Sequence, residues 1–147
     1  MSEAEILAAR YVHGIFCEDV RDEVGGGASF IGVYDHGLRA SEGLPGIVHK
    51  LAAVIWVGFS VNDEAPELEV ALEVPGGTIV ARTSLGRITP RNTEAGLAAI
   101  PFVTRQQARA VIRLKDITLP QAGRLRLLVT AWGKTWTAAS LAIVAET

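Results

Sequence analysis

Period-two alternation of apolar and polar residues, interrupted by turn residues, is the main pattern along this chain. It is clearest over residues 67–74, where Leu68, Val70 and Leu72 alternate with a largely acidic set of positions. Such alternation places successive side chains on opposite faces of a strand. The Pro-Gly-Gly sequence that follows turns the chain back into a partner strand over 78–83, so this segment predicts a β-hairpin.

The same pattern predicts eight or nine short strands in all and no convincing long helix. A succession of short strands separated by turn signals is typical of an all-β sandwich or barrel. We favour a two-layer antiparallel β-sandwich formed by a single domain over residues 1–147, with 1–9 disordered or loosely packed. The last hairpin is expected to turn at Gly133-Lys134, with glycine at the first central position of a type II′ turn. The expected strands are 10–18, 28–34, 47–61, 67–74, 78–83, 97–103, 109–116, 124–132 and 135–144.

Length and cysteine content place the chain in a broad class. A domain of 147 residues buries roughly 70% of its unfolded surface, so it needs no disulfide or metal to fold. Cys17 is its single cysteine, which rules out an internal disulfide and suits a reducing compartment. The sequence shows neither a signal-peptide core nor an apolar run long enough to span a membrane. We therefore expect a cytoplasmic protein without membrane insertion.

Net charge and hydropathy limit the classes of partner that this chain is expected to bind. The net charge is −2, and no strongly basic segment provides the electrostatic footprint of a nucleic-acid-binding protein. The composition is 49% hydrophobic and the mean hydropathy is +0.29, which is high for a sandwich with polar outer faces. Either some strands, such as 51–57, are buried on both faces, or another subunit covers apolar surface.

The N-terminal third carries a family resemblance. An acidic Cys-Glu-Asp-Val-Arg-Asp-Glu segment at 17–23 is followed by glycines and then by Ser-Phe-Ile-Gly-Val-Tyr at 29–34. This arrangement resembles an uncharacterised family of small bacterial β-sandwich domains with a C-(D/E)-D-V-R-x-E turn and an S-x-I-G-V-Y strand. The segment 117–129 looks like the late strands of immunoglobulin-like and C2-like sandwiches. The resemblance implies a fold and no catalytic residues.

An acidic loop over 18–23 is the main candidate binding site. Carboxylates on loops at one end of a sandwich can hold Ca²⁺, which takes six to eight oxygen ligands. The alternative is a solvated turn in which Arg21 neutralises part of the charge, since the spacing of a typical calcium loop is absent. The candidate ligands are Glu18, Asp19, Asp22, Glu23 and, from another strand end, Asp63.

Other reactive residue types lack the partners that catalysis requires. His13, His36 and His49 are far apart and show no metal-ligand spacing. Carboxylates near Cys17 disfavour a reactive thiolate. The three glycines at 25–27 lack the lysine and the helix of a phosphate-binding loop, and no nucleophile elbow is present. We therefore expect neither an enzyme nor a cofactor.

Aromatic and basic residues provide a second set of candidates. Trp132 and Trp136 flank the last turn, where they either pack on the core or form a sticky patch for a protein or a glycan. Arg87 and Arg91 lie in a long loop expected over 84–96, as a partner contact or as ordinary solvated charge.

These observations favour a non-enzymatic interaction or structural module that self-associates. Edge strands of a sandwich can extend a sheet across an interface, and the partner is a second copy or another protein, as in a phage particle or a secretion apparatus. The alternative is a sandwich that binds Ca²⁺ or another small ligand through residues 18–23.

Overall fold

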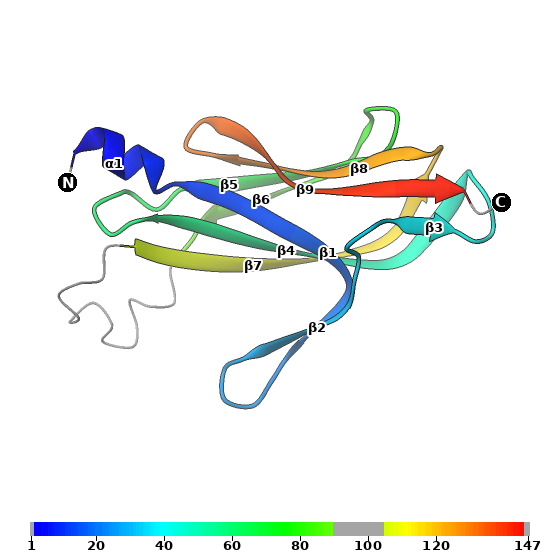
Figure 1. Ribbon diagram of the computed structural model, residues 1–147, viewed down its shortest axis with the longest axis horizontal. Coiled ribbons are helices and arrows are strands. Elements are labelled where there is room, and N and C mark those ends of the chain that lie inside the picture. Colours follow the sequence, from blue (N-terminus) through cyan, green and yellow to red (C-terminus); the bar gives the residue numbers. More distant parts are fainter. Residues whose placement is uncertain (1, 90–104, 146–147) are drawn as a thin grey trace.

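Two β-sheets packed face to face form the body of the molecule (Figure 1). The computed structural model describes residues 2–89 and 105–145. Within these residues the chain forms one short helix and nine strands, which confirms the predicted all-β sandwich. Their bounds are α1 Glu3–Ala8, β1 Tyr11–Asp22, β2 Ala28–Val33, β3 Leu38–Ala40, β4 Gly46–Ser60, β5 Glu67–Glu73, β6 Ile79–Arg87, β7 Arg105–Leu119, β8 Gly123–Ala131 and β9 Lys134–Ala145.

The two sheets differ in strand number and share a mostly antiparallel pairing. The four-stranded sheet has the order β2-β1-β4-β7, and the five-stranded sheet has the order β3-β9-β8-β5-β6. Pairing is antiparallel except between β3 and β9, which run parallel from Leu38 opposite Ile143 to Ala40 opposite Ala145. The predicted antiparallel arrangement holds for the long strands, and at this edge a three-residue strand that the sequence pattern did not reveal runs parallel to β9.

The main core lies between the two sheets. The β5 alternation is as predicted, because Leu68 and Leu72 are almost fully buried while Glu67 and Glu69 are exposed. From the opposite sheet, β4 contributes Leu51, Ile55 and other alternate residues to the same cluster. Burial of such side chains supplies most of the driving force for this fold.

A second, smaller apolar cluster covers the outer face of β4. Its buried members include Ala52 and Val54 of β4 together with Cys17 and Val20 of β1. Side chains of Phe30 and others pack over them. Strand β4 is thus buried on both faces within one chain, which accounts for its continuous apolar sequence without a second subunit.

Residues Glu3–Ala8 of the N-terminal segment form a capped helix, and none of them is buried. The Ser2 hydroxyl accepts a hydrogen bond from the Glu5 amide, and the Glu5 carboxylate accepts one from the Ser2 amide. This reciprocal capping box satisfies helix donors that otherwise lack a partner. None of the helices among residues 2–89 and 105–145 is long and apolar enough to cross a membrane.

Several strand boundaries and one turn differ from the sequence expectation, and β7, for example, covers Arg105–Leu119 where a strand was expected over 109–116. Strand β1 continues through the acidic residues to Asp22, and β6 continues to Arg87. At the last hairpin, Ala131 pairs with Lys134, so the central turn residues are Trp132 and Gly133, with φ of +53° and +72°. Two positive φ values define a type I′ turn instead of type II′. The strand expected at 97–103 lies outside the described residues, as does the 90–96 part of the expected loop.

Candidate functional site

The acidic segment forms half of a projecting β-hairpin, not a loop. Strand β1 pairs with β4 from Tyr11 to Cys17 and with β2 from Cys17 to Asp22. The two strands beyond Cys17 therefore leave the sandwich together, and Figure 1 shows them extending away from both layers. Gly25 and Gly26 close the hairpin with φ of +96° and +90°, which glycine adopts without steric cost. We call residues 18–33 the arm.

Side-chain contacts join the arm to β4 and β7 of the same sheet. The Phe30 ring meets the Trp56 ring edge to face, with centroids 5.5 Å apart. Lys50 Nζ lies 3.2 Å from Asp19 Oδ2, and Arg113 donates a hydrogen bond of 3.0 Å to the Val20 carbonyl. These contacts fix the direction in which the arm projects.

The predicted calcium ligands do not converge. The pKa of Asp19 is lowered, first by a hydrogen bond from the Val20 amide and then by Lys50. Asp63 lies elsewhere and makes two hydrogen bonds to Arg10, at 2.7 and 2.9 Å, which lower its pKa. Glu18 and Asp22 lie on β1, and Glu23 lies in the turn. Within the described part of the chain no three His, Cys, Asp or Glu residues are placed to hold a metal ion, so calcium binding stays a prediction.

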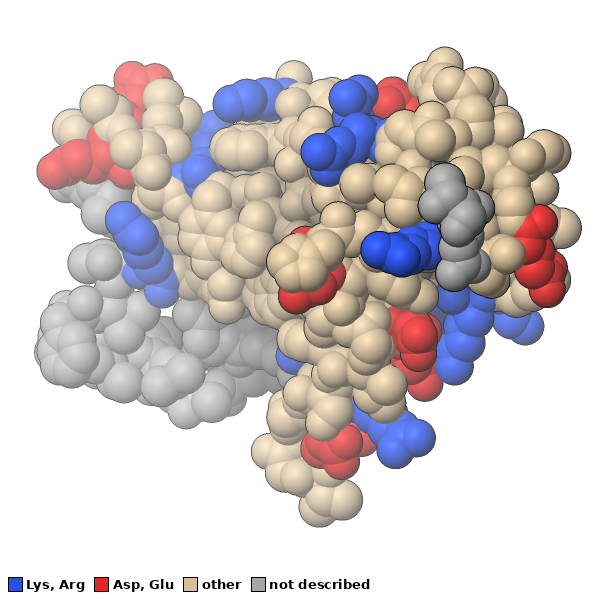
Figure 2. Space-filling view, turned by 45° about the vertical axis from the view of Figure 1, so that its right-hand side comes forward, with Lys and Arg blue, Asp and Glu red and all other residues tan. Residues whose placement is uncertain are grey.

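The free edge of the arm is strand β2, which is terminal in its sheet. None of its residues, Ala-Ser-Phe-Ile-Gly-Val, carries a charge. Ile31 and Val33 expose 36% and 44% of their surfaces. Gly32 has a φ of +64°, so Ala28–Ile31 is the regular extended part. Figure 2 shows the arm as a separate lobe, on which acidic and basic side chains lie among uncharged ones.

The other sheet edges carry features that block strand pairing. Edge strand β7 bears four cationic side chains along its length. Edge strand β6 is paired to β5 with two register shifts and carries Arg82 and Arg87. Strand β3 has three residues. Charges, bulges and shortness are the usual means of protecting a sheet edge, and β2 has the fewest of them. The β7 cations are Arg105, Arg109, Arg113 and Lys115.

A groove on the outer face of the five-stranded sheet brings together Arg87 and Trp132, two residues singled out from the sequence. Trp132 donates a hydrogen bond of 3.1 Å to the Glu64 carbonyl. Arg87 pairs with Glu64 at 3.1 Å and with Glu67 at 3.6 Å, and it donates to the Ala65 carbonyl. These residues line a hollow of about 430 Å³. Trp136 packs edge to face on Trp132, with ring centroids 6.4 Å apart. Arg91, the other arginine singled out from the sequence, lies outside the described residues.

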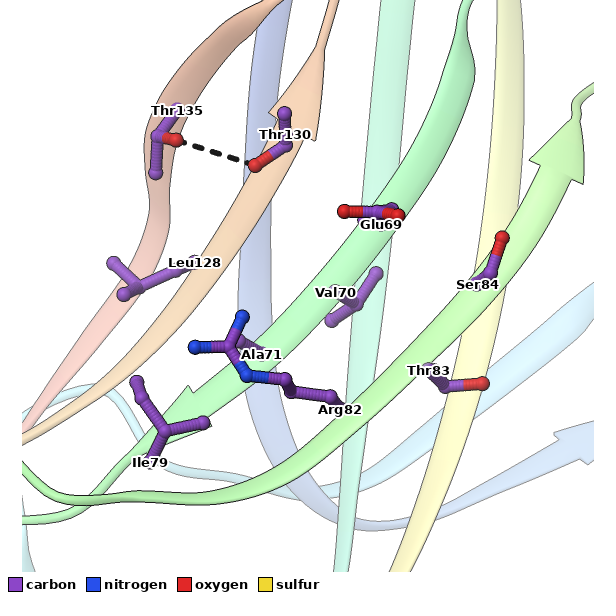
Figure 3. Close-up of a pocket in the computed structure, with 10 residues that line it drawn as sticks. All are labelled: Glu69, Val70, Ala71, Ile79, Arg82, Thr83, Ser84, Leu128, Thr130 and Thr135. Carbon is purple, nitrogen blue, oxygen red and sulfur yellow. Dashed lines mark hydrogen bonds between the residues drawn. The ribbon is translucent and has the colours of Figure 1, made fainter.

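A second hollow of about 390 Å³ continues this groove along β5. The two hollows share Glu69, Ser84 and Thr130 in their linings. Figure 3 shows Glu69 between Thr130 and Ser84, while the Arg82 side chain extends from β6 across Ala71 toward β8. The acidic face predicted for β5 therefore forms the floor of a groove. Sequence analysis missed Ser84 and Thr130, because alternation alone does not show which strands become neighbours of β5.

The histidines and the cysteine lie apart from the groove. His13 stacks between Tyr11 and Trp56, with centroid separations of 5.6 and 5.2 Å. His36 and His49 lie near Asp35 and Asp116 on the surface. Cys17 is fully buried, and burial, followed by the charge of Asp19, raises the pKa of its thiol. A raised pKa reduces the thiolate fraction, as expected for a structural cysteine.

Comparison with known proteins gives a distant likeness to solved structures. No family model and no curated protein matches the chain. Among solved structures, the C-terminal domain of wzt is similar over 94% of this chain and 80% of that domain, with 9% sequence identity and a TM-score of 0.37. This likeness is too distant to carry functional detail to the present chain.

Proposed function

We propose that this chain is a non-enzymatic interaction module that self-associates through the edge of β2. The observation that supports this most directly is the uncharged, terminal strand on a hairpin that projects from the sandwich. An edge strand presents unpaired backbone N–H and C=O groups, which are a template for another strand. Main-chain hydrogen bonds of this kind are a common mode of recognition.

A second copy is the partner that best suits β2. A twofold axis places β2 antiparallel to the β2 of the other copy, and the lack of charge on Ala28–Val33 means that no like charges oppose each other. Pairing of identical patches is the usual form of a homodimer interface. It joins the two four-stranded sheets into one continuous sheet and covers Ile31 and Val33.

Stabilisation of the arm supplies a further contribution. Beyond Cys17 the arm has two strands only, because β1 pairs with β4 no further than Cys17. Val20 and Phe30 pack against β4, but residues 21–27 are all exposed. A two-stranded hairpin without such packing is marginally stable in water, and a third strand makes it more stable. Pairing with the partner's β2 therefore stabilises the segment that makes the contact.

The test is the oligomeric state of three matched proteins by native mass spectrometry and by light scattering after size exclusion. The wild-type chain is expected to be a dimer. Ile31→Lys places a charge on the edge of β2 and is expected to yield a monomer. Val80→Lys is the control, because Val80 is 43% exposed on edge strand β6, and it should remain dimeric. A wild-type monomer at high concentration, or an Ile31→Lys dimer of undiminished affinity, would contradict the proposal.

A further inference from the structure

The groove along β5 has the form of an elongated binding site. Its two hollows, of about 390 and 430 Å³, adjoin at Glu69, Ser84 and Thr130. Glu67 lines one hollow and Ala71 lines the other, and a strand rise of about 3.3 Å per residue separates them by roughly 13 Å. The groove is therefore longer than a ligand that consists of one small ring. It lies on a different sheet from β2, so it stays open when β2 is paired.

Several polar side chains in the groove can still form hydrogen bonds to a ligand. Among the described residues, the side chains of Glu69 and Arg82 have no hydrogen-bond or ion-pair partner. Arg87, by contrast, is occupied by Glu64 and Glu67. The Thr130 and Thr135 hydroxyls lie 3.2 Å apart, and each hydroxyl has further donor or acceptor capacity. Side chains that accept and side chains that donate hydrogen bonds thus line the same groove (Figure 3).

The charges in the groove disfavour strongly charged ligands. The lining carries the carboxylates of Glu64, Glu67 and Glu69 and the guanidiniums of Arg82 and Arg87, which is a formal net charge of −1. A nucleic acid or another polyanion requires a basic surface, and a divalent cation requires several converging oxygens. Neither requirement is met here.

The geometry points to an oligosaccharide as the ligand of this groove. A sugar hydroxyl both donates and accepts, so it suits a carboxylate at Glu69, a guanidinium at Arg82 and hydroxyls at Ser84 and Thr130. The Trp132 ring at one end and Leu128 at the other offer apolar surface to the C–H faces of sugar rings. Because the groove spans several strand residues, a chain of sugars fits it better than a monosaccharide.

The test titrates the 147-residue protein with four uncharged hexasaccharides: maltohexaose, cellohexaose, mannohexaose and chitohexaose. Hexalysine is the comparison ligand. Isothermal titration calorimetry is expected to detect at least one sugar and to show weaker binding of hexalysine. Glu69→Gln and Arg82→Ala should each weaken sugar binding about tenfold or more, since hydrogen bonds to charged groups contribute about 1.5–3 kcal/mol.

Glu73→Gln is the matched control, because Glu73 is on the same strand but bonded to Arg126, and it should leave sugar affinity within about twofold. Thermal unfolding of each variant checks the fold. The proposal is overturned if none of the four sugars binds, if hexalysine binds more tightly than all of them, or if Glu69→Gln and Glu73→Gln have equal effects. Loss of dimerisation in the Ile31→Lys variant with sugar binding intact separates this inference from the proposed function.

Discussion

At the scale of single residues, the Arg10–Asp63 pair connects segments that are distant in sequence. The guanidinium of Arg10 makes two hydrogen bonds to Asp63, whose side chain is only 6% exposed. The same guanidinium lies 4.8 Å from the centroid of the Trp132 ring. Arg10 thus joins the start of β1 to the turn after β4 and to the β8–β9 turn. Paired, hydrogen-bonded charges of this kind contribute more than exposed ion pairs do.

Asp63→Asn should lower the free energy of unfolding at pH 7 by about 1–3 kcal/mol, because it weakens a charged, largely buried hydrogen-bonded pair. The pKa of Asp63 is lowered in the folded state. Its contribution is therefore present above the unfolded-state pKa of about 3.9 and is lost as pH falls through the folded-state value. Urea unfolding at pH 7 and near pH 2.5 should show the difference between wild type and variant narrowing in acid.

The control is Asp35→Asn, because the Asp35 side chain is 75% exposed. It should change stability by less than about 0.5 kcal/mol. A difference between wild type and Asp63→Asn that stays constant from pH 7 to acid would show that the carboxylate charge of Asp63 does not stabilise the fold.

At the scale of elements, the local alternation of apolar and polar residues predicted where strands lie, but it did not predict which strands pair with each other. The alternation in β5 and the double-sided apolar sequence of β4 led directly to the observed burial. The acidic residues of β1 suggested a loop, yet pairing with β2 from Asp19 opposite Ile31 to Asp22 opposite Ala28 extends the strand. Whether a polar segment forms a strand or a loop depends on its pairing with another strand, and a short window of sequence does not show that pairing.

The candidate site was predictable only in part for the same reason. Arg87 and Trp132 were recognisable as single residues, but they come from segments 45 residues apart that the fold places at one groove. The turn type also depended on register: Ala131 opposite Lys134 leaves Trp132 and Gly133 as central residues. Trp132 has a positive φ, which tertiary contacts with Phe59 and Glu64 support.

Gly133→Ala should destabilise the protein by about 1–2 kcal/mol, because a Cβ atom is disfavoured at a φ of +72°. No atom lies within 4 Å of that Cβ, so the cost comes from the backbone and not from a clash. Gly27→Ala is the control: its Cβ also meets nothing within 4 Å and its φ is outside the left-handed range. Denaturant midpoints should fall for Gly133→Ala and stay level or rise slightly for Gly27→Ala. Equal midpoints for the two variants would contradict the assigned turn.

At the scale of the whole molecule, two apolar clusters account for much of the hydrophobic composition. The main cluster fills the space between the sheets, and the smaller one covers the outer face of β4. High apolar content is therefore not in itself an argument for a second subunit. The argument rests on the arm, where Ile31 and Val33 are exposed beside unpaired backbone. The arm belongs to one sheet and the groove to the other, so the molecule can use both at once.

Self-association through β2 also predicts that thermal stability depends on protein concentration. A partner that binds only the folded chain raises the melting temperature by mass action, and in a homodimer that partner is the protein itself. Differential scanning calorimetry over a hundredfold concentration range should show the wild-type Tm rising with concentration. Ile31→Lys, which places a charge on the β2 edge, should show a Tm that does not change, while Val80→Lys on β6 should behave like wild type. A constant wild-type Tm would mean that folding is not coupled to pairing of the arm. A rising Tm in all three proteins would place the interface on a surface other than β2.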